Sequence, residues 1–392
     1  MSVNTLGIEQ AYTLIADIHA QATGKAAQTP TSPADFISVA NATLQAGYDK
    51  VLQAITQVVS KTLMAVRPYN RKFKGLEWST ERWGGITRKI NFGDTPPGPD
   101  PTYSLTNQQS VDQFVVKMPD VLETRYYGSD VYMGGYTIFT KQLDVAFSGP
   151  QEFAEFISAL MTHMNNEREQ WLEGLSRQLL VNAICAKCDL GKELDLLTRY
   201  NDETGLSLTA KTVRQPANFP AFCKWAYAKV SDVSRVMTER SMMYQEPITG
   251  HDIFRHTPYA DQKIYFLADL LQEMESRVIA DTYHDNFLSL ADVEGVGFWQ
   301  NINDPSYAGC TPVYIDGNGA VKTAAGALEK VGICGIMFDR DAIGYNIKDY
   351  SVEVSPYNAM GQYYNIFQHM NVQMCTDFTE KIVVFGIGID DL

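Results

Sequence analysis

The sequence predicts an α+β protein in which an extended hairpin precedes one long helix, and a mixed region and a strand-rich end follow it. Three observations predict this class. Apolar residues recur at three- and four-residue steps from Gln151 to Lys187, which is the spacing of a helix face. A proline-rich stretch separates two segments of alternating polar and apolar residues, a pattern typical of two strands and their loop. Residues 333–392 contain several runs with strand-like alternation.

Residues 1–66 are predicted to form an N-terminal arm. Amphipathic helical segments run from Ile8 to Gln21 and from Ala34 to Val59, and a segment rich in Gly, Ala, Thr, Pro and Ser, Gly24 to Pro33, joins them. An arm of this kind has little apolar core of its own. We therefore expect it to pack on other parts of the fold or on another subunit.

Residues 67–149 are predicted to form an extended loop and the segment that leads to the long helix. The first part of this region is basic, although the chain as a whole carries a net charge of −14. One interpretation is an ordinary solvated face. The other is an interface that meets acidic patches on neighbouring copies. The basic residues are Arg67, Arg71, Lys72, Lys74, Arg82, Arg88 and Lys89.

A long hairpin is predicted after this basic region. Thr87–Phe92 and Asp112–Met118 alternate as two strands. The tip between them, Gly93 to Ser110, carries prolines, which cannot continue a strand ladder and favour an extended, projecting loop. A two-stranded projection is marginally stable alone, so we expect it to lie on another surface. The prolines that we assign to this contact are Pro96, Pro97, Pro99 and Pro101.

Residues 150–217 are predicted to contain the long helix, with Ser148 as its N-cap and Pro150 in its first turn. A polar block, Asn165 to Gln170, interrupts the apolar pattern, so we expect the two halves of the helix to pack on different partners. Residues 218–332 predict a mixed α/β unit with a helix at 221–240, a strand at 263–267 and a helix at 268–279. Strands are predicted in residues 333–392 at 333–338, 350–354, 363–374 and 381–387.

Composition and motifs argue against several functions. The acidic chain is unsuited to gripping nucleic acid, which requires a basic surface. No apolar run reaches the length of a membrane span, no secretory signal is recognised, and the six scattered cysteines suggest reduced thiols. No nucleophile elbow, zinc-protease helix or phosphate loop is found. We therefore predict no catalytic residue, no cofactor and no metal.

Weaker features each have a structural interpretation. Cys185 and Cys188 have the spacing of half a zinc site or a redox pair, but a second pair is missing. Asp316 to Gly319 is a turn or a partial calcium loop, and Gly386-Ile-Gly388 lacks the following helix of a dinucleotide site. Glu167, Arg168 and Glu169 form a charged exposed or intersubunit face rather than a catalytic group. A cytoplasmic enzyme using His251, Asp252 and His256 remains an alternative.

The order of these parts resembles the Hong Kong 97 fold of tailed-bacteriophage major capsid proteins, which has an N-arm, an extended loop, a spine helix, and axial and peripheral domains. Two regions are similar to capsid proteins of short-tailed phages of Gram-positive hosts. One comprises Met118–Tyr127 and Leu143–Phe147, which lead into the long helix. The other comprises Gly335–Ile343, Tyr363–Met370 and Lys381–Gly386 at the strand-rich end.

This resemblance implies a non-enzymatic major capsid protein that self-assembles through hexamers and pentamers into an icosahedral shell. The shell would enclose double-stranded DNA without sequence-specific binding, and portal, scaffolding and decoration proteins would be partners. It also implies a place in the virion after assembly in the host cytoplasm, with residues 218–332 as axial domain and 333–392 as peripheral-domain strands. An encapsulin-type compartment is an alternative. Intersubunit contacts are expected at Arg71, Lys72, Lys74, Arg82, Arg88, Lys89 and the four prolines of the tip.

Overall fold

The computed structural model divides the chain into two compact units, each assembled from segments far apart in the sequence. Unit 1 comprises residues 1–84, 129–175 and 346–373, and unit 2 comprises 85–128, 176–345 and 374–392. None of the helices in the described part of the chain is long and apolar enough to cross a membrane. The structure describes residues 8–391 apart from 27–28, 63–68, 79–85, 95–97, 99, 101–103, 113, 115, 117, 119–120, 249–252, 282–292 and 316–319.

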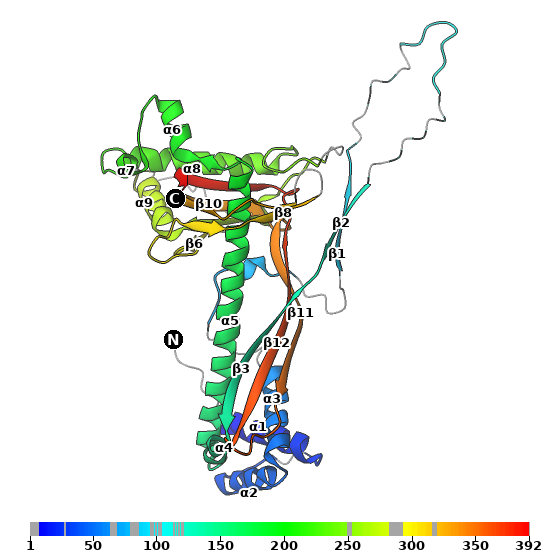
Figure 1. Cartoon of the computed structure of the whole chain (residues 1–392), viewed down its shortest axis with the longest axis vertical. Coiled ribbons are helices and arrows are strands. Elements are labelled where there is room, and N and C mark those ends of the chain that lie inside the picture. Colours follow the sequence, from blue (N-terminus) through cyan, green and yellow to red (C-terminus); the bar gives the residue numbers. More distant parts are fainter. Residues whose placement is uncertain are drawn as a thin grey trace. The chain divides into compact units, whose positions relative to one another are not determined.

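Unit 1 combines helices with a three-stranded antiparallel sheet of order β11-β12-β3 (Figure 1). Its strands are β3 (Asp130–Phe139), β11 (Ile343–Val354) and β12 (Tyr363–Thr376), the last two of which continue into unit 2. Its helices are α1 (Ile8–Thr23), α2 (Pro33–Leu44), α3 (Tyr48–Thr62), the short η1 (Lys74–Leu76), α4 (Thr140–Ala146) and the first part of α5 (Pro150–Asp189).

The arm helices belong to the core of unit 1. Phe36 on α2 is fully buried and lies against Phe153 of α5, with ring centroids 5.6 Å apart. The single helix predicted over 34–59 is two helices, because Gly47 takes a φ of 106° between them, a conformation that side chains disfavour. The expectation that the arm packs on other parts of the fold is thus confirmed.

The long predicted helix is confirmed as α5, of 40 residues. It begins at Pro150, but Ser148 is not its N-cap. The Ser148 hydroxyl donates to the carbonyl of Val145 at the end of α4 (2.6 Å), while the N–H of Phe153 donates to the carbonyl of Gly149 (3.0 Å). Gly149 therefore occupies the capping position, because Ser148 completes the preceding helix instead.

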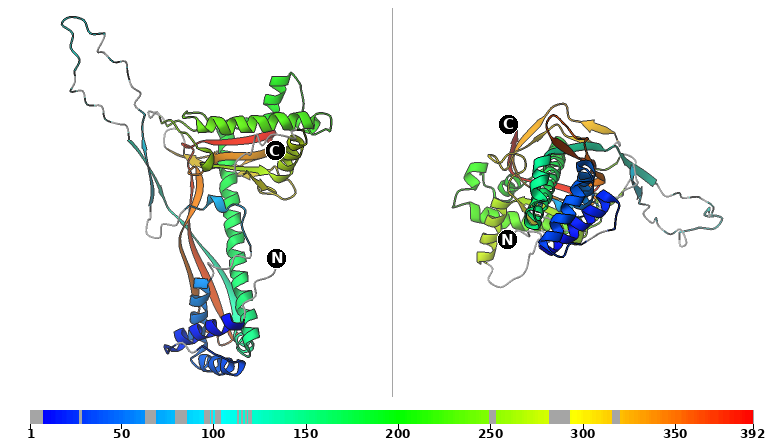
Figure 2. Two further views of the ribbon diagram at one scale, coloured as in Figure 1. Left: turned by 180° about the vertical axis from the view of Figure 1, so that it is seen from behind. Right: turned by 90° about the horizontal axis from the view of Figure 1, so that it is seen from below.

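One face of the unit 1 sheet packs on the first half of α5. Tyr132 lies against Trp171 with ring centroids 4.4 Å apart, and Tyr136 lies against His163 at 6.0 Å. Figures 1 and 2 show the three strands running beside this helix. Since side chains alternate along a strand, the odd-numbered residues of β3 face away from α5.

The second half of α5 packs in unit 2, as the polar block in the middle of the helix predicted. The Asn182 side chain and the backbone of Val313 exchange two hydrogen bonds of 3.0 and 2.9 Å. The ammonium group of buried Lys187 donates to the carbonyl of Tyr244 (3.3 Å) and to Oε1 of Glu246 (3.1 Å). The two halves of the helix therefore use different partners.

Unit 2 is built on a sheet of order β4-β13-β10-β5-β6, with β7 paired to β10 and a separate β8-β9 pair. A further hairpin joins β1 (Ile86–Phe92) and β2 (Val121–Tyr127). The remaining strands are β4 (Leu194–Asp195), β5 (Gln262–Leu267), β6 (Val293–Val296), β7 (Ala308–Cys310), β8 (Val313–Ile315), β9 (Val321–Thr323), β10 (Leu328–Asp339) and β13 (Ile382–Asp391). Its helices are α6 (Leu196–Thr204), α7 (Ala210–Val213), α8 (Phe219–Thr238), η3 (Tyr259–Asp261) and α9 (Ala268–Asp281).

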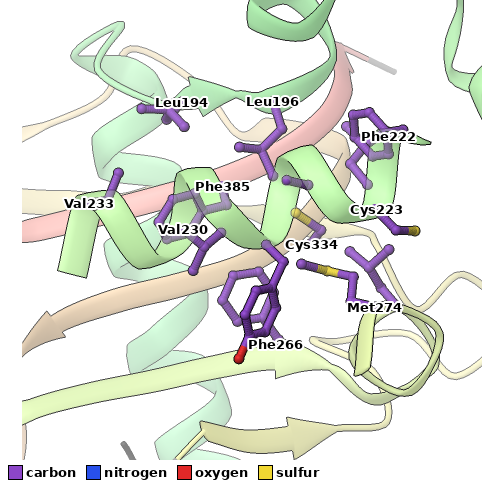
Figure 3. Close-up of a cluster of buried hydrophobic side chains, with 14 of the residues drawn as sticks. Leu194, Leu196, Phe222, Cys223, Val230, Val233, Phe266, Met274, Cys334 and Phe385 are labelled. Atoms are coloured by element: carbon purple, nitrogen blue, oxygen red, sulfur yellow. The ribbon is translucent and has the colours of Figure 1, made fainter. Parts of the chain in front are cut away.

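The core of unit 2 lies between α8 and this sheet (Figure 3). Val230 of α8 points toward Phe266 and Phe385, whose rings stack with centroids 5.5 Å apart. Buried Lys381, directly before β13, caps α8 by donating to the carbonyls of Met237 (3.2 Å) and Glu239 (2.7 Å). A cation at a helix C-terminus satisfies carbonyls that lack partners inside the helix.

The second strand of the hairpin is the main correction to the sequence analysis. Strand β1 pairs with Val121–Tyr127 and not with Asp112–Met118; Phe92 lies opposite Val121 and Thr87 opposite Tyr126. In the predicted segment, the described residues Asp112, Phe114, Val116 and Met118 are not in a strand. Apolar alternation predicts a strand but does not choose its partner. Polar anchors at the base of the hairpin, described below, hold β1 to the rest of unit 2.

We predict that Phe36→Ala lowers the free energy of unfolding by about 3–5 kcal/mol, because it leaves a cavity where α2 meets α5. The neighbouring Ile37, which is exposed, is the control, and Ile37→Ala should change stability by less than about 0.5 kcal/mol. Denaturant unfolding measures both. Equal small effects would show that the arm is not part of the core.

Candidate assembly surfaces

Arg71 is an internal residue of unit 1, with partners in its own chain. It is only 4 % exposed, forms an ion pair with Glu77, and its Nε lies 3.6 Å from Oε2 of Glu169 on α5. Close by, the Tyr69 hydroxyl donates to Oε2 of Glu173 (2.6 Å). The polar block of α5 is therefore partly a buried network.

The interpretation of Glu167 to Glu169 as an exposed or intersubunit charged face is wrong for Glu169, which is buried against Arg71. Glu167 is exposed and accepts from Nε2 of His163 at 3.0 Å. The Arg168 guanidinium lies 3.3 Å from Glu169 and above the Tyr350 ring. Sequence spacing could not find this, because the partner Arg71 is distant in the chain.

Lys89 fixes the base of the hairpin to unit 2. Its ammonium group lies 2.5 Å from Oδ2 of Asp377 and 2.5 Å from Oε1 of Glu380, and both carboxylates are buried. Burial alone would lower the pKa of Lys89, but the two carboxylates raise it above its ordinary value. Burial would likewise raise the pKa of Asp377, but the charge of Lys89 and hydrogen bonds from Lys89 and Thr379 lower it.

Three more polar contacts hold the hairpin base. The Arg255 guanidinium donates to Oδ1 of Asn91 on β1 (2.5 Å) and lies 3.3 Å from Glu380. Asp94, just beyond β1, pairs with Arg240. Burial raises the pKa of the Tyr126 hydroxyl on β2, as does neighbouring Asp377. The contacts of Lys89, Asn91 and Asp94 are made by β1 and the residues just beyond it, so they fix β1 to the rest of unit 2.

The other predicted contact residues are divided. Lys72 and Lys74 are exposed, and the exposed Arg88 side chain lies 2.7 Å from Glu123 across the hairpin. Arg67 and Arg82 lie outside the described residues, as do the prolines of the tip, Pro96, Pro97, Pro99 and Pro101. Two of the basic residues, Arg71 and Lys89, therefore hold the fold of a single chain, and Lys72, Lys74 and Arg88 remain candidates for contacts with other copies.

An exposed apolar strip, which the sequence analysis did not single out, follows the hairpin and its loop. The described loop residues extend beyond the ends of β1 and β2 (Figure 1). Phe114, Val116 and Met118 are 81 %, 77 % and 84 % exposed, which is unusual for three apolar side chains so close together. The sequence feature that could have indicated this strip is the apolar alternation of Asp112–Met118, which was interpreted as a strand. The strip consists of Ile90, Phe92, Phe114, Val116, Met118 and Val121.

The residues considered for chemistry do not assemble into a site within the described chain. Cys185 and Cys188 are buried thiols, and no group of three or more potential metal-binding side chains occurs among the described residues. His256 is exposed, while His251, Asp252 and 316–319 lie outside the described residues.

The Gly386-Ile-Gly388 segment has a packing role in β13. Gly388 has a φ of 64° and donates its N–H to Oδ1 of Asp195 (2.9 Å), the residue that also caps α6. A Cβ on Gly332, the neighbouring glycine of β10, would lie 2.6 Å from the carbonyl oxygen of Gly388. These glycines allow the two strands to approach closely.

An anchored hairpin with an exposed apolar strip, a 40-residue helix and two α+β units define a shell-forming subunit of the Hong Kong 97 type. The fold is confirmed by comparison with solved structures. The capsid structure of Staphylococcus phage Andhra matches with a TM-score of 0.54 at 11 % identity, over 83 % of this chain and 86 % of that one. A structure of the head fibre and inner core protein gp22 of native bacteriophage P68 contains a chain that matches with a TM-score of 0.53 at 12 % identity, over 82 % and 86 %.

The chain belongs to the Phi29-like phage major capsid protein family, whose model matches residues 16–386. It is thus a major capsid protein, a structural component of a bacteriophage shell. The resemblance recognised in the sequence is confirmed at the level of this family. A comparison with curated proteins finds no match.

We predict that Arg71→Met lowers the free energy of unfolding by about 3–5 kcal/mol, because Glu169 would be left as a buried charge without its cation. Lys72→Met, at the exposed neighbouring position, should have an effect below about 0.5 kcal/mol. Urea unfolding of unassembled protein gives both values. Similar small losses would mean that Arg71 does not stabilise α5.

Lys89→Met should cost about 3 kcal/mol at pH 7, because the two buried carboxylates lose their cation. The lowered pKa of Asp377 stabilises the fold above its ordinary value of 3.8, and this contribution disappears as the pH falls through the folded-state pKa. The difference between wild type and variant should therefore shrink below pH 3.8. Unfolding at pH 7 and at pH 3 measures it, with Arg88→Met as the exposed control. A loss independent of pH would contradict the ion-pair explanation.

Proposed function

We propose that copies of this major capsid protein assemble through hexamers and pentamers into an icosahedral shell around double-stranded DNA. Each copy lays the region from Arg67 to Lys117 over an adjacent copy. The observation that carries the proposal is the exposure of Phe114, Val116 and Met118, which a single chain leaves in water. Heterologous contacts between such surfaces close into rings and shells when the geometry permits.

The net charge of the chain supports a shell that encloses DNA without binding it tightly. The net charge of −14 disfavours close contact with phosphates. Several basic residues that break this acidity are used within the chain, as Arg71 and Lys89 are. The wall of the shell therefore encloses DNA without sequence-specific binding.

The proposal extends to organisation and partners. Residues 1–66 serve as N-arm, 67–149 as extended loop and start of the peripheral domain, 150–217 as spine helix and peripheral domain, 218–332 as axial domain and 333–392 as peripheral strands. Portal and scaffolding proteins take part in assembly in the host cytoplasm, and decoration proteins bind the finished shell. The family match favours this role over an encapsulin compartment or an enzyme.

Electron microscopy with light scattering of the purified protein, alone and with the products of its neighbouring genes, tests the proposal. Closed shells tens of nanometres across, or separate pentamers and hexamers, are the expected result. A stable monomer or dimer under every condition would overturn it.

The exposed part of the basic cluster has its own test. We predict that Lys72→Glu/Lys74→Glu raises the protein concentration needed for assembly about ten-fold, or about 1.4 kcal/mol per contact, without changing the unfolding temperature. The matched control, Lys141→Glu/Lys211→Glu, reverses two exposed lysines elsewhere. Light scattering at low and high salt measures the effect, which should fade with salt. Unchanged assembly of the first variant would exclude these lysines from the interface.

A further inference from the structure

Two cysteines far apart in the sequence meet where β7 lies against the second half of α5 in unit 2. The Cys310 thiol on β7 donates to the carbonyl oxygen of Val181 on α5, with Sγ 3.8 Å from that oxygen. Cys185 follows Val181 by one helical turn, and residues four apart share a helix face. The Cys185 thiol in turn donates to the sulfur of Cys310. The two sulfur atoms are therefore neighbours.

The chain beyond Cys310 is fixed along the same helix. The Asn182 side chain exchanges hydrogen bonds of 3.0 and 2.9 Å with the backbone of Val313. The Tyr314 hydroxyl donates to Oδ2 of Asp189 at the end of α5 (2.6 Å). Cysteine sulfurs can bond only where the backbone already brings the side chains together. These contacts hold Cys310 at one level of the helix and keep it beside Cys185.

The two thiols differ in access and in acidity. Cys185 is fully buried, whereas Cys310 is partly exposed. The hydrogen bond from Cys185 lowers the pKa of Cys310, although burial opposes this. The same hydrogen bond, together with burial, raises the pKa of Cys185. Because the thiolate is the reactive form of cysteine, Cys310 reacts first with a reagent from solvent, and Cys185 lies beside the product.

A metal centre explains this pair less well than a disulfide. Zinc requires three or four ligands, and the described residues contain no group of three or more side chains that could hold a metal. Cys188 lies three residues after Cys185 on the same helix and is also buried, so it is the rival partner that an experiment must separate from Cys310.

We propose that Cys185 and Cys310 are a redox-sensitive pair, which stays reduced while the protein is made and closes to a disulfide between α5 and β7 in the released virion. Disulfides are rare in the cytoplasm and persist in oxidising surroundings, including virion surfaces. The timing rests on the proposed shell function, whereas the pair itself lies within one copy of the chain.

The oxidant is a small disulfide such as oxidised glutathione. The Cys310 thiolate attacks one of its sulfurs, forms a mixed disulfide and releases the first glutathione as a thiolate. Cys185 then loses its proton to solvent, and its sulfur attacks Sγ of Cys310 and releases the second glutathione. Both glutathione thiolates take up protons. In sum, two protein thiols are oxidised to one disulfide, and one glutathione disulfide is reduced to two thiols.

The disulfide would stabilise unit 2 against unfolding. The loop that it closes, residues 185–310, carries α6, α7, α8, β5 and α9. A crosslink across a long loop restricts the unfolded chain strongly. The folded chain already holds the two sulfurs together, so little rearrangement opposes the bond.

Peptide mapping of unassembled, full-length protein tests the pair. The protein is treated with oxidised glutathione, its remaining thiols are alkylated, and it is denatured and digested with trypsin without reduction. Trypsin cuts after Lys187 and so separates Cys185 from Cys188. Mass spectrometry should find a peptide that joins Cys185 to Cys310 and that disappears on reduction.

Variants test the order of events and the stabilisation. Oxidation should raise the unfolding temperature of wild type by about 5–10 °C, and Cys310→Ala should abolish this gain. Cys188→Ala, the matched control on the same helix, should retain it. Cys185→Ala should stop at a mixed disulfide of glutathione with Cys310, because the second nucleophile is missing.

The outcomes distinguish this pair from the proposed assembly. Absence of the joined peptide after oxidation, or Cys185 joined to Cys188 instead, would overturn the pair whether or not shells form. A complete disulfide in protein alkylated at the moment of cell lysis would overturn the proposed timing. Absence of shells from wild type under every condition would overturn the assembly, while the joined peptide would still establish the pair.

Discussion

The described part of the chain exposes apolar side chains that neither of its two cores buries. The roles of the other parts of the structure follow from this constraint. Both units have complete cores, around Phe36 and Phe153 in unit 1 and around Phe266 and Phe385 in unit 2. The strip from Ile90 to Val121 belongs to neither core. Burying a large apolar side chain is worth about 1.5–3 kcal/mol, and the single chain forgoes this free energy at Phe114, Val116 and Met118. A subunit of a shell needs such a surface, whereas monomeric proteins rarely expose apolar patches of this kind.

The ion pairs of Arg71 and Lys89 have a different role, which is to fix the segments that carry these residues to their own unit. Arg71 and Lys89, from the one basic region of the chain, each pair with two carboxylates of their own unit. Lys89 ties β1 to the turn between β12 and β13, so the hairpin leaves unit 2 from a fixed base. A fixed base reduces the conformational entropy lost when the loop binds, and it therefore strengthens each contact without adding any. Buried pairs are costly to desolvate, which makes them better suited to specifying a geometry than to adding stability.

A shell multiplies contacts that are individually modest. In a closed shell every copy makes the same kinds of contact with its neighbours, and these many contacts act together.

The sequence by itself determined the elements whose signal is local. The spacing of apolar residues was sufficient for α5, α8, α9 and the strands of the C-terminal region, and Pro150 marked the start of the long helix. It also contained the order of parts by which the family was recognised. Tertiary structure decided the partner of β1, the burial of Glu169 in the middle of α5 and the internal role of Arg71 and Lys89. These depend on groups far apart in the chain, since Lys89 meets Asp377 across 288 positions. Periodicity reports which face of a segment is apolar, but the partner of a charge or of a strand edge is chosen only when distant segments are brought together.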